Sequence, residues 1–209
     1  MEGDWPRIGR RIFLGHRMTC LRCIVFLTFL VLSSNVRADL QAGIASYRAG
    51  NYESALQEFK PLAAKGNADA QVNLGFLYAR GHGVKQDYKE ALIWYRKAAE
   101  QGQPDAQFNL GSLYYDGLGI GRDPTKAAEW YAKAAELGQI DAQYNLGLMH
   151  VTGQGVPVSM VQAHKWLSIA AALGDKEAEE SKKLAEAKMT SEQIDQAQAL
   201  AQAWWALRK

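Results

Sequence analysis

Histidines and closely spaced glycines are the residues of this sequence that most invite a chemical interpretation. Gly81-His82-Gly83 has the short glycine spacing of a phosphate-binding loop. It lacks a third glycine, a preceding strand and a Lys-Ser/Thr pair, so it is better interpreted as a turn between helices. His82, His150 and His164 do not have the spacing of zinc ligands, and no cysteine accompanies them. We therefore expect no metal site, no cofactor and no catalytic residue.

The remaining reactive residue types give no stronger signal. No serine lies in a Gly-x-Ser-x-Gly nucleophile motif. Glu179 and Glu180 lie in a charged stretch, where carboxylates are normally solvated. Cys20 and Cys23 are the only two cysteines, and both precede the region expected to fold. Their spacing therefore carries little weight as redox or metal chemistry, and the rest of the chain can form no disulfide.

Residues 1–38 are expected to be a secretory signal peptide. Arginines precede an apolar run over residues 23–32, and Val36-Arg37-Ala38 ends in a small residue. The run is about half of the roughly 20 residues that span a bilayer, so a retained membrane anchor is the weaker alternative. Translation from Met18 would also produce a signal. We expect cleavage at about Ala38, a periplasmic or secreted protein, and membrane contact only before cleavage.

The charge distribution argues against a nucleic-acid partner. Six of the 24 basic side chains and two of the 22 acidic ones lie before Asp39, so the rest of the chain carries 18 and 20. Nucleic-acid binding requires a concentrated positive surface, which a near-neutral body without a basic block does not provide.

The elements that position these residues come from one stretch that occurs three times. The copies span residues 67–102, 103–138 and 139–174, and their closing glycines are 36 residues apart. A fixed period of this size indicates a repeat architecture. A shortened version occupies residues 39–66. The pattern decays over residues 175–209, where we expect a capping helix pair whose second helix opens with a capping box at Thr190.

Each copy is expected to contain two helices. In the first copy, one helix begins near Asp69, whose carboxylate can cap free N–H groups, and ends at Gly81. The other begins after Asp87 and ends at Gly102. The later copies repeat this pattern, with Asp105 and Asp141 at the first starts and Asp123 and Ser159 at the second.

The motif shared by the copies is Asp-Ala-Gln-x-Asn-Leu-Gly, then Tyr, Gly-x-Gly, Ala, Trp-Tyr and a closing Gly. The third copy departs from it at His150, which we expect to be a packed core residue, and at Leu167. This motif is similar to that of the Sel-one-like repeat family, relatives of the tetratricopeptide repeats. The resemblance implies an all-α fold, a right-handed superhelical solenoid of antiparallel helix pairs.

The resemblance also implies a function. Members of this family mostly act as scaffolds or adaptors that bind a protein or peptide, here in the cell envelope. The alternative is a β-lactamase-like or cell-wall-active enzyme, as reported for cysteine-rich relatives. Those relatives pair cysteines within each repeat, and the copies in this chain contain none.

Positions that are identical in the copies are expected to stack the helices. In the first copy they are Ala70, Leu74, Gly75, Ala91, Trp94 and Ala98. A glycine inside a helix costs about 1 kcal/mol relative to alanine, which a close approach of Gly75 to Ala91 would justify. Trp94, Trp130 and Trp166 are expected to bury large apolar areas between copies.

Positions that differ between copies fall on one face of the first helix. Their offsets of 0, 4, 7 and 8 residues place them on the same side. In the tetratricopeptide relatives this face lines a concave peptide groove. Its aromatic and aliphatic content favours an apolar segment of a partner, and the alternative is ordinary variation of a solvated surface. The predicted partner site consists of Val72, Phe76, Ala79, Arg80, Phe108, Ser112, Tyr115, Asp116, Tyr144, Leu148, Val151 and Thr152.

Three identical asparagines, Asn73, Asn109 and Asn145, lie beside this face and complete the predicted site. Their amides could form a ladder of hydrogen bonds to the backbone of a bound peptide. A structural bond to the neighbouring copy is an equally good interpretation.

Overall fold

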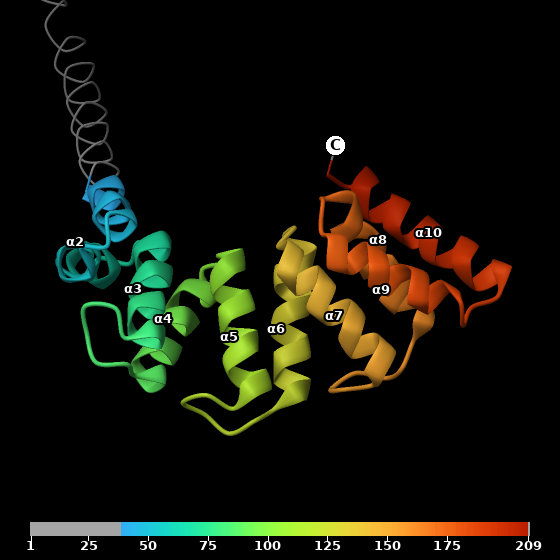
Figure 1. The fold of residues 1–209 in the computed structure, drawn as a ribbon, viewed down its shortest axis with the longest axis horizontal. Helices are drawn as coiled ribbons and strands as arrows, with labels where there is room; N and C mark the ends of the chain where they lie inside the picture. Colours follow the sequence, from blue (N-terminus) through green and yellow to red (C-terminus); the bar gives the residue numbers. More distant parts are fainter. Residues whose placement is uncertain (1–38, 209) are drawn as a thin grey trace, which may run out of the picture.

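The computed structural model describes residues 39–208, which form a row of α-helices without any strand (Figure 1). Residues 39–48 are helical. The helices that follow are α2 (Tyr52–Ala64), α3 (Ala68–Arg80), α4 (Tyr88–Glu100), α5 (Pro104–Asp116), α6 (Pro124–Glu136), α7 (Ile140–Thr152), α8 (Met160–Ala172), α9 (Lys176–Glu186) and α10 (Ser191–Ala206). In this part of the chain no helix has the length and apolar character needed to cross a membrane. The signal peptide predicted over residues 1–38 lies outside the described residues.

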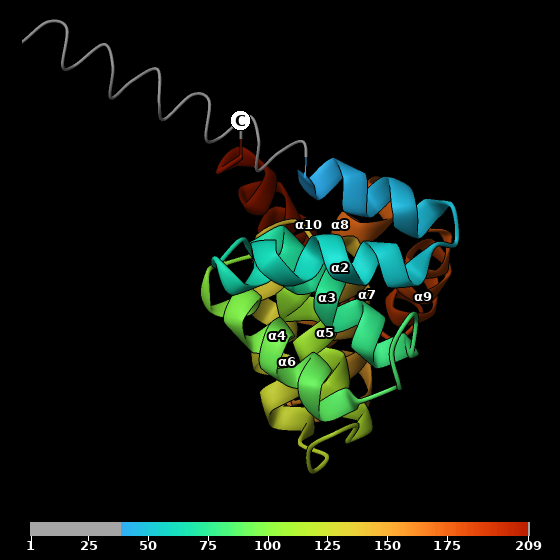
Figure 2. The same cartoon turned by 90° about the vertical axis from the view of Figure 1, so that its left-hand side faces the viewer.

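The three copies form the pairs α3/α4, α5/α6 and α7/α8. The two helices of a pair pack against each other, and the second packs against the first helix of the next pair. In Figure 1 the chain advances along the row from blue to red. Figure 2 shows the row from its N-terminal end, so that successive pairs lie behind one another. The all-α solenoid predicted from the repeat is confirmed.

The second helix of each copy begins where the sequence predicts. Asp87, Asp123 and Ser159 are the N-caps of α4, α6 and α8, and their side chains accept hydrogen bonds from the free N–H groups of the first turn. The first helix of each copy ends at a glycine in the left-handed conformation, as at Gly81 with φ 70°.

The predicted caps of the first helices, Asp69, Asp105 and Asp141, are wrong. The caps lie two positions earlier in each copy: Asn67, Gln103 and Gln139. The Asn67 side chain accepts a hydrogen bond from the backbone N–H of Ala70 at 2.8 Å. Asp69 lies within the first turn, where its charge still interacts favourably with the helix dipole without acting as the cap.

The glycines inside the first helices allow the two helices of a pair to approach closely. A Cβ atom on Gly75 would lie 2.8 Å from the Tyr95 ring, and one on Gly111 would lie 2.8 Å from the Tyr131 ring. The close approach follows the prediction, but the nearest partner of Gly75 is Tyr95, not Ala91. Tyr95, four residues after Ala91, fills the space next to Gly75.

The repeated tryptophans are less buried than predicted. Trp166 is 4% exposed, whereas Trp94 and Trp130 are half-buried, with lysine ammonium groups 4.2 and 3.9 Å from their ring centroids. The difference arises at the C-terminal end, where α10 packs on α8 and brings Trp204 into the same core cluster as Trp166. Helix α10 therefore covers Trp166, whereas the corresponding Trp94 and Trp130 remain partly exposed.

The last helix departs from the repeat pattern. The capping box at Thr190 is confirmed, because Thr190 and Gln193 each accept a hydrogen bond from the other's backbone N–H. Beyond α10, Arg208 makes a 3.1 Å ion pair with Glu136 at the end of α6. The C-terminal segment therefore returns to α8 and α6 (Figure 1).

Candidate partner-binding site

The structure places the predicted partner-site residues along α3, α5 and α7, and none of their side chains is fully buried. We call this set the variable face. The invariant alanines and leucines of the same helices, such as Ala106 and Leu110, are completely buried. Each first helix therefore has one side that is fully buried and another side that is partly exposed.

A cavity of about 400 Å³ lies on the variable face between α5 and α7. Six predicted residues line it: Ser112, Tyr115, Asp116, Asn145, Leu148 and Thr152. Three further residues complete the lining: Tyr131 from α6, Met149 from α7 and Gln154 from the following turn. The volume falls within the range of roughly 300–1,000 Å³ that is usual for ligand sites.

Tyr131 is the most deeply buried aromatic residue of this cavity, at 3% exposure. Its ring centroid lies 5.6 Å from that of Phe108, and its hydroxyl lies 3.0 Å from Ser112 Oγ. Burial raises the pKa of Tyr131 to about 12, with the hydrogen bond to Ser112 acting against this and the charge of Asp116 adding to it. The phenol therefore stays protonated at neutral pH and can donate a hydrogen bond.

Gln154 links Tyr115 and Arg122 at the rim of the cavity. Its Oε1 accepts hydrogen bonds from the Tyr115 hydroxyl at 2.9 Å and from Arg122 Nη2 at 3.3 Å. Arg122 Nε also donates to the Tyr115 carbonyl at 3.0 Å, and its guanidinium carbon lies 5.5 Å from the Tyr115 ring centroid. Arg122 is thus bound to the wall of the cavity.

The N-terminal end of the variable face meets an aromatic cluster. His82 stacks on Tyr52 with ring centroids 4.2 Å apart, and Tyr47 lies 5.2 Å from Tyr52. Phe76 packs edge-on against Tyr47 at 5.9 Å, and the guanidinium carbon of Arg80 lies 5.5 Å from the Phe76 ring. Phe76 is therefore tied to the shortened repeat and lies apart from the cavity.

Other predicted residues are also separated from the cavity. Tyr144 packs against a small core cluster that contains Leu167 and Ala178, towards the C-terminal end. Asn145 lines the cavity, but Asn73 donates its amide to the Asp69 carbonyl of its own helix at 2.8 Å. This hydrogen bond of Asn73 lies within its own helix and does not connect neighbouring copies.

His150 is half-buried, and is not the packed core residue that the sequence suggested. Its Nδ1 lies 3.2 Å from the Pro157 carbonyl in the turn after α7. Burial lowers the pKa of His150, the contact with Pro157 raises it, and the positive charge of Lys165 lowers it further. The histidine therefore adds a side-chain contact to the turn, beside the backbone hydrogen bond from Ser159 to the His150 carbonyl that the other copies also form at this position.

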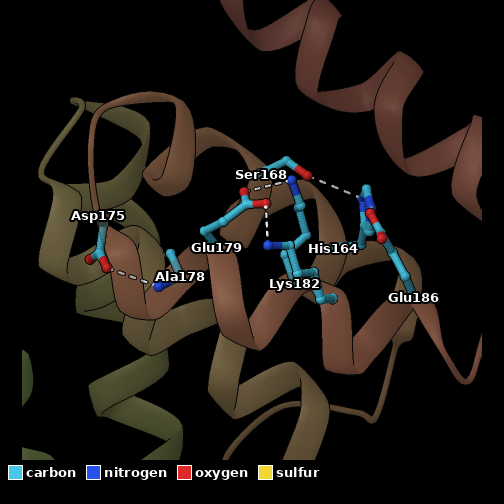
Figure 3. A network of polar contacts seen from close by, with 8 residues as sticks. His164, Ser168, Asp175, Ala178, Glu179, Lys182 and Glu186 are labelled. Atoms are coloured by element: carbon cyan, nitrogen blue, oxygen red, sulfur yellow. Dashed lines mark hydrogen bonds and ion pairs between the residues drawn. The ribbon is translucent and has the colours of Figure 1, made fainter.

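A cluster of hydrogen-bonded polar side chains lies between α8 and α9 (Figure 3). His164, which is 1% exposed, has Nε2 2.7 Å from Glu186 Oε1 and Nδ1 3.2 Å from Ser168 Oγ. Nucleophilic hydrolases use serine, histidine and a carboxylate in this order. Ser168 lies in the middle of α8, where backbone N–H groups are engaged in the helix and do not form an oxyanion hole. We interpret the network as a polar clamp between two helices.

No group of histidine, cysteine, aspartate and glutamate side chains within residues 39–208 is arranged to hold a metal ion.

Comparisons with known proteins give a consistent result. The family model described as the Sel1 repeat matches residues 68–103, 104–139 and 140–175. A Sel1 repeat protein from Oxalobacter formigenes is 39% identical with a TM-score of 0.67, over 69% of this chain and 60% of that one. A protective antigen with an SLR fold, present in uropathogenic Escherichia coli strains, is 30% identical with a TM-score of 0.55, over 78% of this chain and 46% of that one. The chain thus spans less than two thirds of each, and no curated protein matches.

Proposed function

This chain belongs to the Sel1 repeat family, and we propose that it is a scaffold that holds a protein or peptide partner against the variable face. Sel1 repeats generally mediate protein–protein interactions, and proteins built from them are generally non-catalytic. The observation that supports this proposal most strongly is the cavity between α5 and α7, because six of its nine lining residues belong to the variable face that the sequence predicts for binding.

The partner is expected to be an extended or helical segment with apolar side chains. Tyr115, Leu148 and Met149 offer aromatic and aliphatic surface beside hydrogen-bonding groups on Ser112 and Asn145. Recognition of peptides in grooves commonly combines apolar anchors with such polar contacts, and a few anchors provide most of the binding free energy.

We expect a Tyr115→Ala, Leu148→Ala double variant to lose partners that the wild-type protein captures from a cell-envelope extract. Both side chains line the cavity and are only half-buried, so their removal shortens the apolar surface without opening the core. Loss of one anchor costs about 1–2 kcal/mol, so we expect recovery of specific partners to fall at least tenfold. Quantitative mass spectrometry of the captured proteins measures this.

The control for this experiment is an Ile93→Ala, Leu137→Ala double variant. These side chains are 46% and 55% exposed and do not line the cavity. The control should capture the wild-type set of partners, and circular dichroism should show the same helicity in all three proteins. Equal capture by the cavity variant and the wild type would contradict the proposed site.

We also propose that the protein is exported and that the scaffold acts in the cell envelope. The basis is the basic segment, apolar run and Ala38 of the N-terminal sequence. The intact mass of protein purified from its native envelope should correspond to a chain that starts at about Asp39. A Leu27→Arg change within the apolar run should keep the protein in the cytoplasm, and Gln41→Arg, outside the run, should not. A mature mass that still includes residues 23–32 would support the retained anchor instead.

A further inference from the structure

We propose that the cavity between α5 and α7 receives a lysine or arginine side chain of the bound peptide, held by the carboxylate of Asp116. This inference rests on the proposed function, and it adds the chemistry of one contact and its position along the variable face.

The first argument is charge. Asp116 is the one formally charged residue among those that line the cavity, and its side chain is exposed. Within residues 39–208 no hydrogen bond or ion pair to its carboxylate is formed. Arg122 lies at the rim of the same cavity, but its guanidinium bonds to Gln154 and to the Tyr115 carbonyl and forms no ion pair with Asp116. The carboxylate is therefore available to a cation from a partner, in a charge-assisted hydrogen bond.

The second argument is the position of Asp116 in its helix. Asp116 is the last residue of α5, whose C-terminal end carries the partial negative charge of the helix dipole. The carboxylate and the helix end therefore favour the same kind of ligand charge. The negative charge of Asp116 also acts on Tyr131 in the same cavity, where it adds to the pKa increase that burial causes.

The third argument is that the cavity combines apolar side chains with hydrogen-bond acceptors. A lysine or arginine has a long apolar stem and a charged end, and such side chains lay the stem along apolar surface. Leu148, Met149 and the ring of Tyr115 provide that surface. The amide oxygen of Asn145 and the hydroxyl of Thr152 provide acceptors near it, since Thr152 uses its own proton to bond the Leu148 carbonyl at 3.0 Å.

The fourth argument is that these features occur in one copy alone. At the positions of Ser112 and Asp116, the first copy has Phe76 and Arg80, and the third copy has Leu148 and Thr152. The combination of a small side chain with a carboxylate is therefore confined to the middle copy. A single cationic contact there would fix the register of a peptide along a face that has no second carboxylate.

The test uses random heptapeptide libraries that differ in one fixed central residue. Two libraries have a cationic central residue, arginine or lysine. Two others have the corresponding neutral residue, citrulline in place of arginine and norleucine in place of lysine. A fifth library has glutamate. Binding of each fluorescent library to the purified protein is measured by anisotropy. We expect the arginine and lysine libraries to bind about tenfold more tightly than the citrulline and norleucine libraries, which corresponds to one charge-assisted contact.

Two substitutions locate the effect. Asp116→Asn keeps the shape of an exposed side chain and should abolish the preference for a cationic centre, and Asp116→Lys should shift the preference to glutamate. Glu129→Gln changes the net charge by the same amount as Asp116→Asn at an exposed position of α6 that does not line the cavity. It should leave the preference intact.

The outcomes distinguish this inference from the proposed function. If the libraries bind but the central residue and Asp116→Asn make no difference, the cationic contact is overturned and the scaffold stands. If no library binds at millimolar concentration, the cationic contact is overturned, whereas the proposed function is overturned only when the cavity variant captures the same partners as the wild type. If N-acetylarginine amide binds as tightly as the libraries, the cavity recognises a free cation, and the peptide-bound side chain is overturned.

Discussion

Replacing Gly119 with alanine is expected to lower the free energy of unfolding by about 2–5 kcal/mol, through left-handed backbone strain and overpacking. Gly119 has φ 69°, a conformation that disfavours any side chain. An added Cβ would also lie 2.6 Å from the carbonyl carbon of Tyr88. Tyr88 starts α4 in the preceding copy, so this glycine allows the backbone of one copy to touch the backbone of another.

Gly138→Ala separates the two causes. Gly138 has φ 90°, but no described atom outside its chain neighbours lies within 4 Å of the position of its Cβ. This control carries backbone strain without a clash, and we expect it to cost about 1–2 kcal/mol. Urea denaturation followed by circular dichroism measures both variants. A Gly119→Ala protein no less stable than Gly138→Ala would show that the copies do not depend on this backbone contact.

Trp204→Ala is expected to destabilise the C-terminal end by about 3–5 kcal/mol, the usual cost of removing a buried tryptophan. Trp204 is 5% exposed and belongs to the core cluster that contains Trp166 and Ile169. Its ring also lies 3.8 Å from the guanidinium carbon of Arg208, which pairs with Glu136. Loss of the ring therefore removes apolar contact with α8 and weakens the contact with α6.

The loss should be local, because repeats contact only their neighbours. Hydrogen exchange should accelerate in α10 and α8 of the Trp204→Ala variant and change little in α3 and α4. Trp205→Ala is the matched control, since this adjacent tryptophan is half-buried, and we expect it to cost about 1 kcal/mol. A larger effect at Trp205, or uniform loss of protection along the chain, would contradict this role for Trp204.

The 36-residue period predicted the fold because each copy contains the same signals for the start and end of its helices. Asp87, Asp123 and Ser159 are short polar side chains directly before an amphipathic run, and they cap as expected. The first helices were placed less accurately, because Gln103 and Gln139 are unusual caps and an aspartate two residues later gave a stronger but misleading signal.

The candidate site was only half visible in the sequence. Ser112, Tyr115 and Leu148 follow from the spacing along two helices, because a helix fixes which residues share a side. Tyr131 and Gln154 reach the cavity from another helix and from a turn, and spacing within α5 or α7 contains no information about them. The glycine at position 111 was the available hint for Tyr131, since it signalled a bulky neighbour.

The contacts of the C-terminal segment join residues that are far apart in the sequence, so no local sequence pattern predicts them. His164 and Glu186 are separated by 22 residues, and Arg208 and Glu136 by 72 residues. Both pairs form because α9 and α10 pack on the last full copy. The burial of Trp166 has the same origin. The repeat predicts equal environments for Trp94, Trp130 and Trp166, but α10 covers only Trp166.

The position of α10 also decides which surface the last full copy exposes. A stack of identical modules has no intrinsic stopping point, and an open last module can recruit another molecule end to end. Here the helix after the last copy exposes Glu177, Glu180 and Lys183 at its surface, and α10 turns back instead of extending the row. The C-terminal side of the last full copy is thereby covered by its own chain. A module inserted between two closing glycines, upstream of α9 and α10, would leave this cover in place.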